Sequence, residues 1–177
     1  MGKINTLKTE RLILRPLSIE DLCEVNDYSS NADNTKYLTS PNRNLEETQD
    51  YLTWVVDEWN KNSPQYYGFA VILGDKLIGE IAFGGEYETS EVGIGWIIHR
   101  DFWNCGYATE AAAAIVDLCF NSMSINKITT ACDIENIASR HVMEKLGMKL
   151  QSENEPWEYK DGRISKAASY FLQKHTV

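Results

Sequence analysis

A glycine turn between an apolar strand and an alanine-rich helix has the residue types of an anion-binding site. The strand is expected at 91–98, the turn ends at Gly106, and the helix is expected from Tyr107 to about Phe120. The first amides of a helix have no partner within the helix, and the helix dipole adds partial positive charge beside them. Gly106 lets the backbone approach a phosphate closely, and Ala108 keeps a nearby position small. The segment predicts phosphate binding without a basic side chain, although many such turns are plain connections.

The elements that would hold this turn follow from periodicity and turn signals. Ser18 and Asn44 each cap an expected helix, the second at 45–59, and the polar segment 31–43 between them reads as a loop. Apolar runs at 67–73 and 76–83 predict a hairpin. A strand at 127–133, a helix at 136–146 ended by Gly147, and closing strands at 148–154 and 164–173 complete the chain. The order β-α-α-β-β-β-α-β-α-β-β predicts a mixed α/β layer sandwich.

Composition limits the classes of protein to consider. The length of 177 residues suits a single domain spanning 1–177, and the formal net charge of −9 argues against a sequence-independent nucleic-acid binder. That charge fits attraction of a cationic amine, and it also fits solubility alone. No stretch is long and apolar enough to span a membrane, and the four cysteines form no C-x-x-C pair. A reduced, cytoplasmic protein without a metal site is expected; the sequence allows a homodimer without deciding the oligomeric state.

Three segments together resemble one family. The stretch 103–108 fits the Q/R-x-x-G-x-G/A pyrophosphate loop of the GNAT superfamily of N-acetyltransferases, except that Trp103 stands where the pattern has Gln or Arg. The opening Thr9-Glu10-Arg11-Leu12-Ile13-Leu14-Arg15-Pro16 resembles the first strand of the RimJ/RimL-type branch. The run from Asn136 to Met148 resembles that branch's N-x-A-S…E-K-x-G-F segment. The segments fall in the family's order, so the chain is identified as a RimJ/RimL-like member over roughly Leu7 to the C-terminus.

The resemblance implies a mostly antiparallel GNAT-type sheet and an acetyl-CoA-dependent N-acetyltransferase. Acetyl-CoA would be the co-substrate, and the acceptor would be a protein N-terminal α-amine or a small amine. Direct attack in a ternary complex is expected, because no Cys-His or Ser-His arrangement is visible. The residues expected to contact the coenzyme are Trp96, Ile97, Ile98, Trp103, Asn104, Cys105, Gly106, Tyr107, Ala108, Thr109, Asn136 and Ser139. We expect additional side-chain contacts to the coenzyme phosphates from Arg100, Arg140 and Lys145.

The central strand at 91–98 has two features of interest. In the family this strand splays from its neighbour, and its free backbone groups, which fall by position at 96–98, dock the pantetheine arm. Gly93 and Gly95 weaken the strand, which is consistent with a bulge, a close ligand approach or a packing requirement.

The start of the helix at 136–146 has a structural and a functional interpretation. Asn136 is expected to cap the helix, with Ser139 in its first turn. The resemblance adds that Asn136 contacts pantetheine and that Ser139 is the partner of the leaving thiolate. Many family members use a tyrosine here as the acid, but its position is Met143, which cannot donate a proton.

The general base has three candidates. RimL-like enzymes have a glutamate just before the final hairpin turn, and Glu158 matches that place. Other members use an acid on the central strand where this chain has Gly93; Glu91 lies two residues earlier on the same face. Glu80 could approach from the neighbouring strand. We rank Glu158 first, Glu91 second and Glu80 third, with a solvated surface charge as the alternative for each.

A second class of function also fits the sequence. Because Met143 and Gly93 occupy two positions that often carry the chemistry, the chain could bind acetyl-CoA as a sensor or partner module without turnover. Such a protein would bind the coenzyme yet acetylate nothing in a broad amine screen.

Overall fold

One mixed sheet runs through the molecule. The computed structural model describes residues 6–40, 42–85 and 89–174, within which eight strands form a sheet in the order β1-β2-β3-β4-β5-β6-β8-β7. The strands are β1 (Leu7–Lys8), β2 (Leu12–Pro16), β3 (Tyr66–Leu73), β4 (Lys76–Gly84), β5 (Glu91–Ile98), β6 (Lys127–Asp133), β7 (Lys149–Glu158) and β8 (Ile164–Gln173). The helices are α1 (Leu22–Ser29), α2 (Ala32–Thr35), α3 (Leu45–Trp59), α4 (Tyr107–Ser122) and α5 (Ile137–Lys145), with 3-10 turns at Ile19–Asp21 and Arg100–Phe102. The mostly antiparallel α/β class predicted from the sequence is confirmed.

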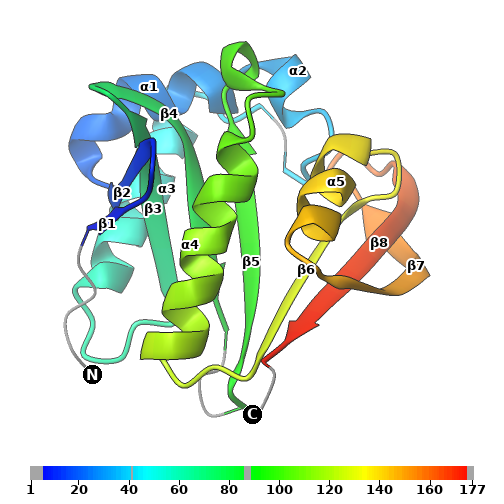
Figure 1. Cartoon of the computed structure of the whole chain (residues 1–177). Helices are drawn as coiled ribbons and strands as arrows, with labels where there is room; N and C mark the ends of the chain where they lie inside the picture. Colours follow the sequence, from blue (N-terminus) through cyan, green and yellow to red (C-terminus); the bar gives the residue numbers. More distant parts are fainter. Residues whose placement is uncertain (1–5, 41, 86–88, 175–177) are drawn as a thin grey trace.

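Helices cover both faces of the sheet. Helices α4 and α5 contact each other on one face, and α1 and α3 pack together on the other (Figure 1). Each face has its own apolar core: Ile115 of α4 packs with the sheet in the larger cluster, whereas Leu52 and Val55 of α3 pack in the smaller one. Helix α3 begins as predicted, because Asn44 and Glu47 form a capping box in which each side chain accepts from the other's amide at 2.9 Å.

The sheet opens between β5 and β6. These strands are the parallel pair among the described strands, and they pair only over Glu91–Gly93 and Lys127–Thr129. On its other side β5 stays paired with β4 in a continuous register up to Ile98. The two strands diverge beyond Gly93, toward the end of the sheet at which α4 begins (Figure 1). The predicted splay is therefore present, and it leaves one edge of β5 open from Ile94 onward.

Two predicted segments differ from the structure. The expected loop at 31–43 contains the short helix α2, because the Asn31 side chain accepts from the amides of Asp33 and Asn34 and so starts a helical turn. The first expected strand is divided into β1 and β2. Between them the Leu12 amide donates to the Thr9 hydroxyl oxygen at 2.9 Å. None of the helices within the described residues combines the length and apolar character that crossing a bilayer requires.

Candidate active site

The turn before α4 has a left-handed backbone at two positions. Gly106 precedes the helix with a φ of 82°, and Asn104 has a φ of 60°. Glycine enters this region without strain, and asparagine is among the side chains that tolerate it. The Trp103 indole donates to the carbonyl of Ile98 at 2.7 Å. The departure from the family pattern at Trp103 therefore has a structural role, since it ties the turn to the end of β5.

Arg11 fixes the same turn from the start of β2. Its Nη1 donates to the carbonyl of Cys105 at 3.0 Å, and its guanidinium lies 4.6 Å from the ring centroid of Tyr107. In a trans peptide the carbonyl and the following amide point in opposite directions. Because Arg11 holds the Cys105 carbonyl, the Gly106 amide is directed away from Arg11. The sequence analysis assigned no function to Arg11, although it lies in the segment that carried the family resemblance.

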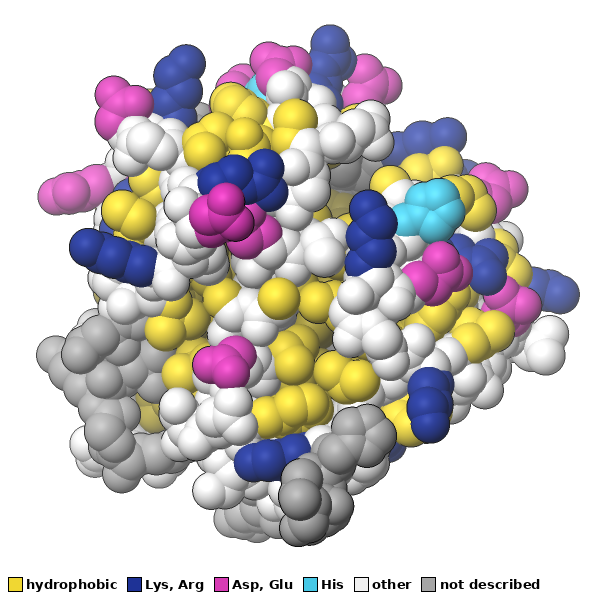
Figure 2. Space-filling model, in the orientation of Figure 1, with side chains coloured by type: hydrophobic (Ala, Val, Ile, Leu, Met, Phe, Trp, Pro, Cys, Tyr) yellow, Lys and Arg dark blue, Asp and Glu magenta, His cyan; other side chains and the backbone are white. Residues whose placement is uncertain are grey.

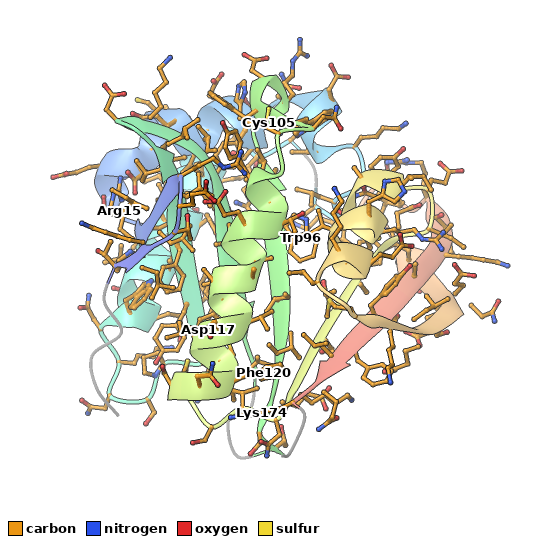
Figure 3. All side chains as sticks on the ribbon, in the orientation of Figure 1. Arg15, Trp96, Cys105, Asp117, Phe120 and Lys174 are labelled. Atoms are coloured by element: carbon orange, nitrogen blue, oxygen red, sulfur yellow. The ribbon has the colours of Figure 1, made fainter. Side chains whose placement is uncertain are left out.

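A cavity of about 350 Å³ lies at the start of α4. Four segments line it: α2 with the residues that follow it, the end of β5, the turn with the first residues of α4, and α5 with its cap. The predicted coenzyme contacts found in its lining are Trp96, Ile97, Ile98, Trp103, Asn104, Gly106, Tyr107, Ala108, Thr109, Asn136 and Ser139. Cys105 is outside this lining, because its thiol is exposed and bonds to the Trp103 carbonyl. Figure 3 shows Trp96 between β5 and α5, and Cys105 at the turn that precedes α4.

The open edge of β5 offers backbone groups to this cavity. The Ile98 carbonyl accepts from the Asn34 side chain at 2.7 Å on the side away from β4. Backbone groups of alternate residues in a strand point to the same edge, so the amide and carbonyl of Trp96 also face the gap toward β6. Ile97 lies in register with Glu80, and its backbone faces β4 instead. Of the three predicted β5 contacts, Trp96 therefore directs both its amide and its carbonyl to the open edge, whereas the Ile98 carbonyl is already engaged by Asn34 and Trp103.

Asn34 was missed by the sequence analysis. Besides its bond to Ile98, its side-chain oxygen accepts from the Arg100 amide at 3.0 Å. Asn34 thus joins α2 to the end of β5 and lines the cavity. Its asparagine-rich surroundings suggested a loop, and nothing in that pattern distinguished it from its neighbours.

The start of α5 has the predicted cap. The Asn136 side chain accepts from the Ser139 amide at 3.1 Å, so the structural interpretation of this pair is confirmed. The Ser139 side chain also lines the cavity, and among the described residues no hydrogen bond engages its hydroxyl. Met143 is 1% exposed and packs in the core.

Basic side chains contribute little to the cavity. Lys145 lines it, but Arg100 pairs with Asp33 at 2.7 Å and Arg140 pairs with Glu153 at 2.6 Å, and neither arginine is in the lining. Over the face that carries α4 and α5, Lys and Arg side chains are scattered among acidic ones rather than gathered in a patch (Figure 2). An anion held here would depend mainly on backbone amides.

A second cavity, of about 580 Å³, meets the first at Leu38, Trp96 and Ile97. One sheet face forms its floor: Glu80, Ala82 and Gly84 of β4 lie opposite Ile97, Gly95 and Gly93 of β5. A Cβ at Gly95 would meet no atom within 4 Å. Packing therefore does not require Gly95 to be glycine, and the continuous β4–β5 register shows no bulge there. The remaining interpretation is space for a ligand.

Glu80 is a buried carboxylate in this second cavity. It is 9% exposed, and its two oxygens accept from Tyr28 at 3.0 Å and from Tyr51 at 3.1 Å. Burial raises the pKa of Glu80 above its ordinary value, although the charge of Arg43 and the two tyrosine hydrogen bonds act in the opposite direction. Tyr51 also bonds to the hydroxyl of Tyr66 at 3.1 Å, and Tyr66 lines the cavity. Glu80 therefore has both direct and tyrosine-relayed access to a molecule bound there.

The other two candidate bases lie elsewhere. Glu91 is at the start of β5, where Lys127 pairs with it at 3.0 Å. Glu158 is exposed at the end of β7, opposite Ile164. Neither glutamate lines either cavity. Among the described residues no group of His, Cys, Asp and Glu has the arrangement of a metal site.

Comparison with known proteins identifies the family. The chain matches the acetyltransferase (GNAT) domain over residues 11–149. It is 34% identical over 148 residues to the uncharacterized N-acetyltransferase YnaD of Bacillus subtilis, a match that covers 82% of this chain and 83% of that protein. The chain belongs to the GNAT family, and it is an acetyltransferase.

Solved structures share the whole fold. A GNAT-family acetyltransferase from Bacillus anthracis superposes with a TM-score of 0.83 at 28% identity, covering 95% of this chain and 98% of that one. The RimL ribosomal-protein alpha-N-acetyltransferase, solved in complex with coenzyme A, has a TM-score of 0.86 at 16% identity, covering 96% and 98%. At that identity the second likeness concerns the fold alone.

Proposed function

We propose that this protein transfers an acetyl group from acetyl-CoA to a primary amine by direct attack within a ternary complex. The observation that carries the proposal is that two cavities meet at the end of β5, over Leu38, Trp96 and Ile97. One cavity has the backbone groups suited to a coenzyme, and the other has a buried carboxylate suited to an ammonium group. An acyl group and an amine bound in the two cavities would meet at their shared wall, and positioning of this kind can lower a barrier by about 7–11 kcal/mol.

The cavity at α4 is the proposed coenzyme site. The unpaired amides after Gly106 would hold the pyrophosphate, and the open edge of β5 at Trp96 would pair with the amide groups of the pantetheine arm. The RimL-type neighbour binds coenzyme A in the same fold, which supports this assignment. Ser139, in the lining and with a hydroxyl not engaged by described residues, is the proposed donor to the thiolate that leaves.

Glu80 is the proposed general base, in preference to Glu158 and Glu91. A base must lie within hydrogen-bond reach of the proton it removes, and of the three only Glu80 lines a cavity. The raised pKa of Glu80 lies closer to neutral pH, and a carboxylate with a higher pKa is a stronger base. Tyr28 and Tyr51 remain neutral donors, because burial and the nearby Glu80 charge hold the pKa of each well above its ordinary value.

The test is acetylation of a broad amine panel with labelled acetyl-CoA, combined with calorimetry of coenzyme binding. The panel contains peptides with free N-termini, polyamines, amino acids and simple aliphatic and aromatic amines. Coenzyme binding with turnover of at least one amine is expected. Binding without any turnover across the panel would favour the sensor or partner module instead, and failure to bind acetyl-CoA would refute both.

A further inference from the structure

Arg43 is exceptional among the arginines of this chain. Each of the other five has a carboxylate partner within 4 Å: Arg11 with Glu110, Arg15 with Asp21, Arg100 with Asp33, Arg140 with Glu153 and Arg163 with Asp161. The guanidinium of Arg43 lies 4.0 Å from the ring centroid of Tyr51, and among the described residues it forms neither an ion pair nor a side-chain hydrogen bond. Arg43 is half-buried and lines the second cavity, called the acceptor cavity below because the proposed function places the amine there. Its five donors are therefore available to an anionic group of a bound molecule.

Glu80 and Arg43 give this cavity two charges of opposite sign; Glu58 also lines it, but Lys61 pairs with that carboxylate. Arg43 is close enough to favour the ionised form of Glu80, yet among the described residues no ion pair within 4 Å joins the two side chains. Aromatic side chains line the wall near these charges, where the rings of Trp54 and Tyr66 pack at a tilt with 4.7 Å between their centroids. The cavity thus combines a negative group, a positive group and an apolar surface.

We propose that the acceptor is a small zwitterion, a free α-amino acid or close analogue with an apolar or aromatic side chain, whose ammonium lies at Glu80 and whose carboxylate lies at Arg43. The assignment rests on the proposed function, in which this cavity holds the acceptor. In the reaction Glu80 takes one proton from the ammonium, and the freed amine nitrogen bonds to the acetyl carbonyl carbon. The carbon–sulfur bond then breaks, Ser139 donates its proton to the thiolate, and the second amine proton restores the Ser139 hydroxyl. The products are the N-acetyl amino acid and free coenzyme A.

The charge pair discriminates against other amines. A peptide N-terminus places a neutral carbonyl where the amino acid has its carboxylate, and a decarboxylated amine places nothing there. Either would leave Arg43 without an anionic partner in a largely apolar cavity. A hydrogen-bonded charge pair of this kind contributes about 1.5–3 kcal/mol, so selectivity of about 10- to 100-fold is expected.

Arg43 has one alternative role, which is to act on Glu80 alone. If its charge only favours the ionised base, removing it should slow every acceptor by the same factor and shift every pH profile. If Arg43 also binds the carboxylate, removing it should slow acceptors that carry one far more than acceptors that do not. The two roles are separated by comparing acceptors rather than by comparing variants alone.

The experiment measures kcat/KM for wild type, Arg43→Gln and Arg43→Lys with apolar and aromatic L-amino acids, each beside its amide and its decarboxylated amine. The best free amino acid should exceed its two analogues by about 10- to 100-fold in the wild type. Arg43→Gln should abolish that preference, because the free amino acid should lose about 10- to 100-fold more than its analogues lose through the weaker ionisation of Glu80. Arg43→Lys should keep part of the preference. Equal rates for the three acceptors, or an equal loss across all of them in Arg43→Gln, would overturn the proposal.

A binding measurement keeps the proposal separate from the proposed function. Calorimetry with coenzyme A present compares each free amino acid with its decarboxylated amine in the wild type and in Arg43→Gln. Tighter binding of the free amino acid, lost in Arg43→Gln, supports the zwitterion site even if turnover is absent. Turnover of simple amines together with equal binding of both forms would retain the acetyltransferase function and refute the zwitterion site.

Discussion

Arg11 and Glu110 are 99 residues apart in the sequence and form an ion pair of 2.6 Å directly behind the predicted phosphate loop. Glu110 lies in the first turn of α4, and Thr9 also donates to it at 2.5 Å. Burial acts to raise the pKa of Glu110, but the hydrogen bonds from Thr9 and Arg11 outweigh it and the pKa is lowered. The pair therefore joins the first strands to α4. It also neutralises the negative charge of Glu110 beside the predicted phosphate loop.

Replacement of Arg11 by glutamine should weaken coenzyme binding. The change leaves Glu110 unneutralised near the phosphates and releases the Cys105 carbonyl, so the Gly106 amide loses its fixed direction. We expect acetyl-CoA affinity to fall about tenfold, or about 1.4 kcal/mol, by calorimetry. Arg163→Gln is the matched control, because Arg163 also pairs with a carboxylate but lies in the turn between β7 and β8, away from the turn before α4. Equal affinities for the two variants would contradict the role given to Arg11.

Gly106→Glu should abolish acetyl-CoA binding. A carboxylate at the anion site would repel the pyrophosphate, and we expect a loss of more than about 100-fold in affinity. Gly162→Glu is the control, since Gly162 has a similar φ of 87° in an exposed turn and imposes comparable backbone strain. Unchanged affinity in a folded Gly106→Glu protein would remove the basis for the coenzyme site.

Ser139→Ala should lower kcat with little change in thermal stability. The cap of α5 uses the Ser139 backbone amide, which alanine retains, whereas the hydroxyl is the proposed donor to the leaving thiolate. We expect kcat to fall about 100-fold, with the KM for acetyl-CoA nearly unchanged. Asn136→Ala should instead lower the free energy of unfolding by about 1 kcal/mol, because it removes the cap of α5. Wild-type kcat in Ser139→Ala would exclude the serine as thiolate donor.

Glu80→Gln should be nearly inactive, whereas Glu158→Gln should resemble the wild type. Loss of a general base lowers rates by about 10²- to 10⁴-fold, and of these two glutamates only Glu80 lines the second cavity. Wild-type kcat/KM should rise with pH as Glu80 ionises, and this limb should disappear in Glu80→Gln. Saturation curves distinguish a base from a group that only attracts the amine, whose loss would raise the acceptor KM at unchanged kcat. The reverse result, with Glu158→Gln inactive, would restore Glu158 as the base.

The same substitution should stabilise the folded protein at neutral pH. The folded-state pKa of Glu80 is raised, so its contribution to stability is full below its unfolded pKa and is lost as pH rises through the folded value. Glutamine has no charge to bury, and the melting temperature of Glu80→Gln should exceed that of the wild type increasingly with pH across that range. A wild-type protein that is more stable than Glu80→Gln at neutral pH would show that the ionised Glu80 network favours folding.

Much of the fold was readable from local sequence. Helix α3 begins and ends where predicted, because Asn44, Glu47 and the apolar spacing are features within a few residues of one another. The same holds for β6, for the hairpin around Gly74 and for the glycine turn before α4. Helix α2 was missed because a single turn started by Asn31 has too few residues to show a period.

The sequence by itself determined the family, the order of the main elements, and two of the segments that line the cavity at α4, since these depend on short-range patterns around Gly106 and Asn136. Only the tertiary structure decided which carboxylate lies in the acceptor cavity, because strand pairing and not chain position puts Glu80 opposite Ile97 and leaves Glu158 exposed at the far edge. It also brought Arg11 to Glu110 and left Arg43 without a carboxylate partner among the described residues. Contacts between residues far apart in the chain depend on packing, which no local pattern encodes.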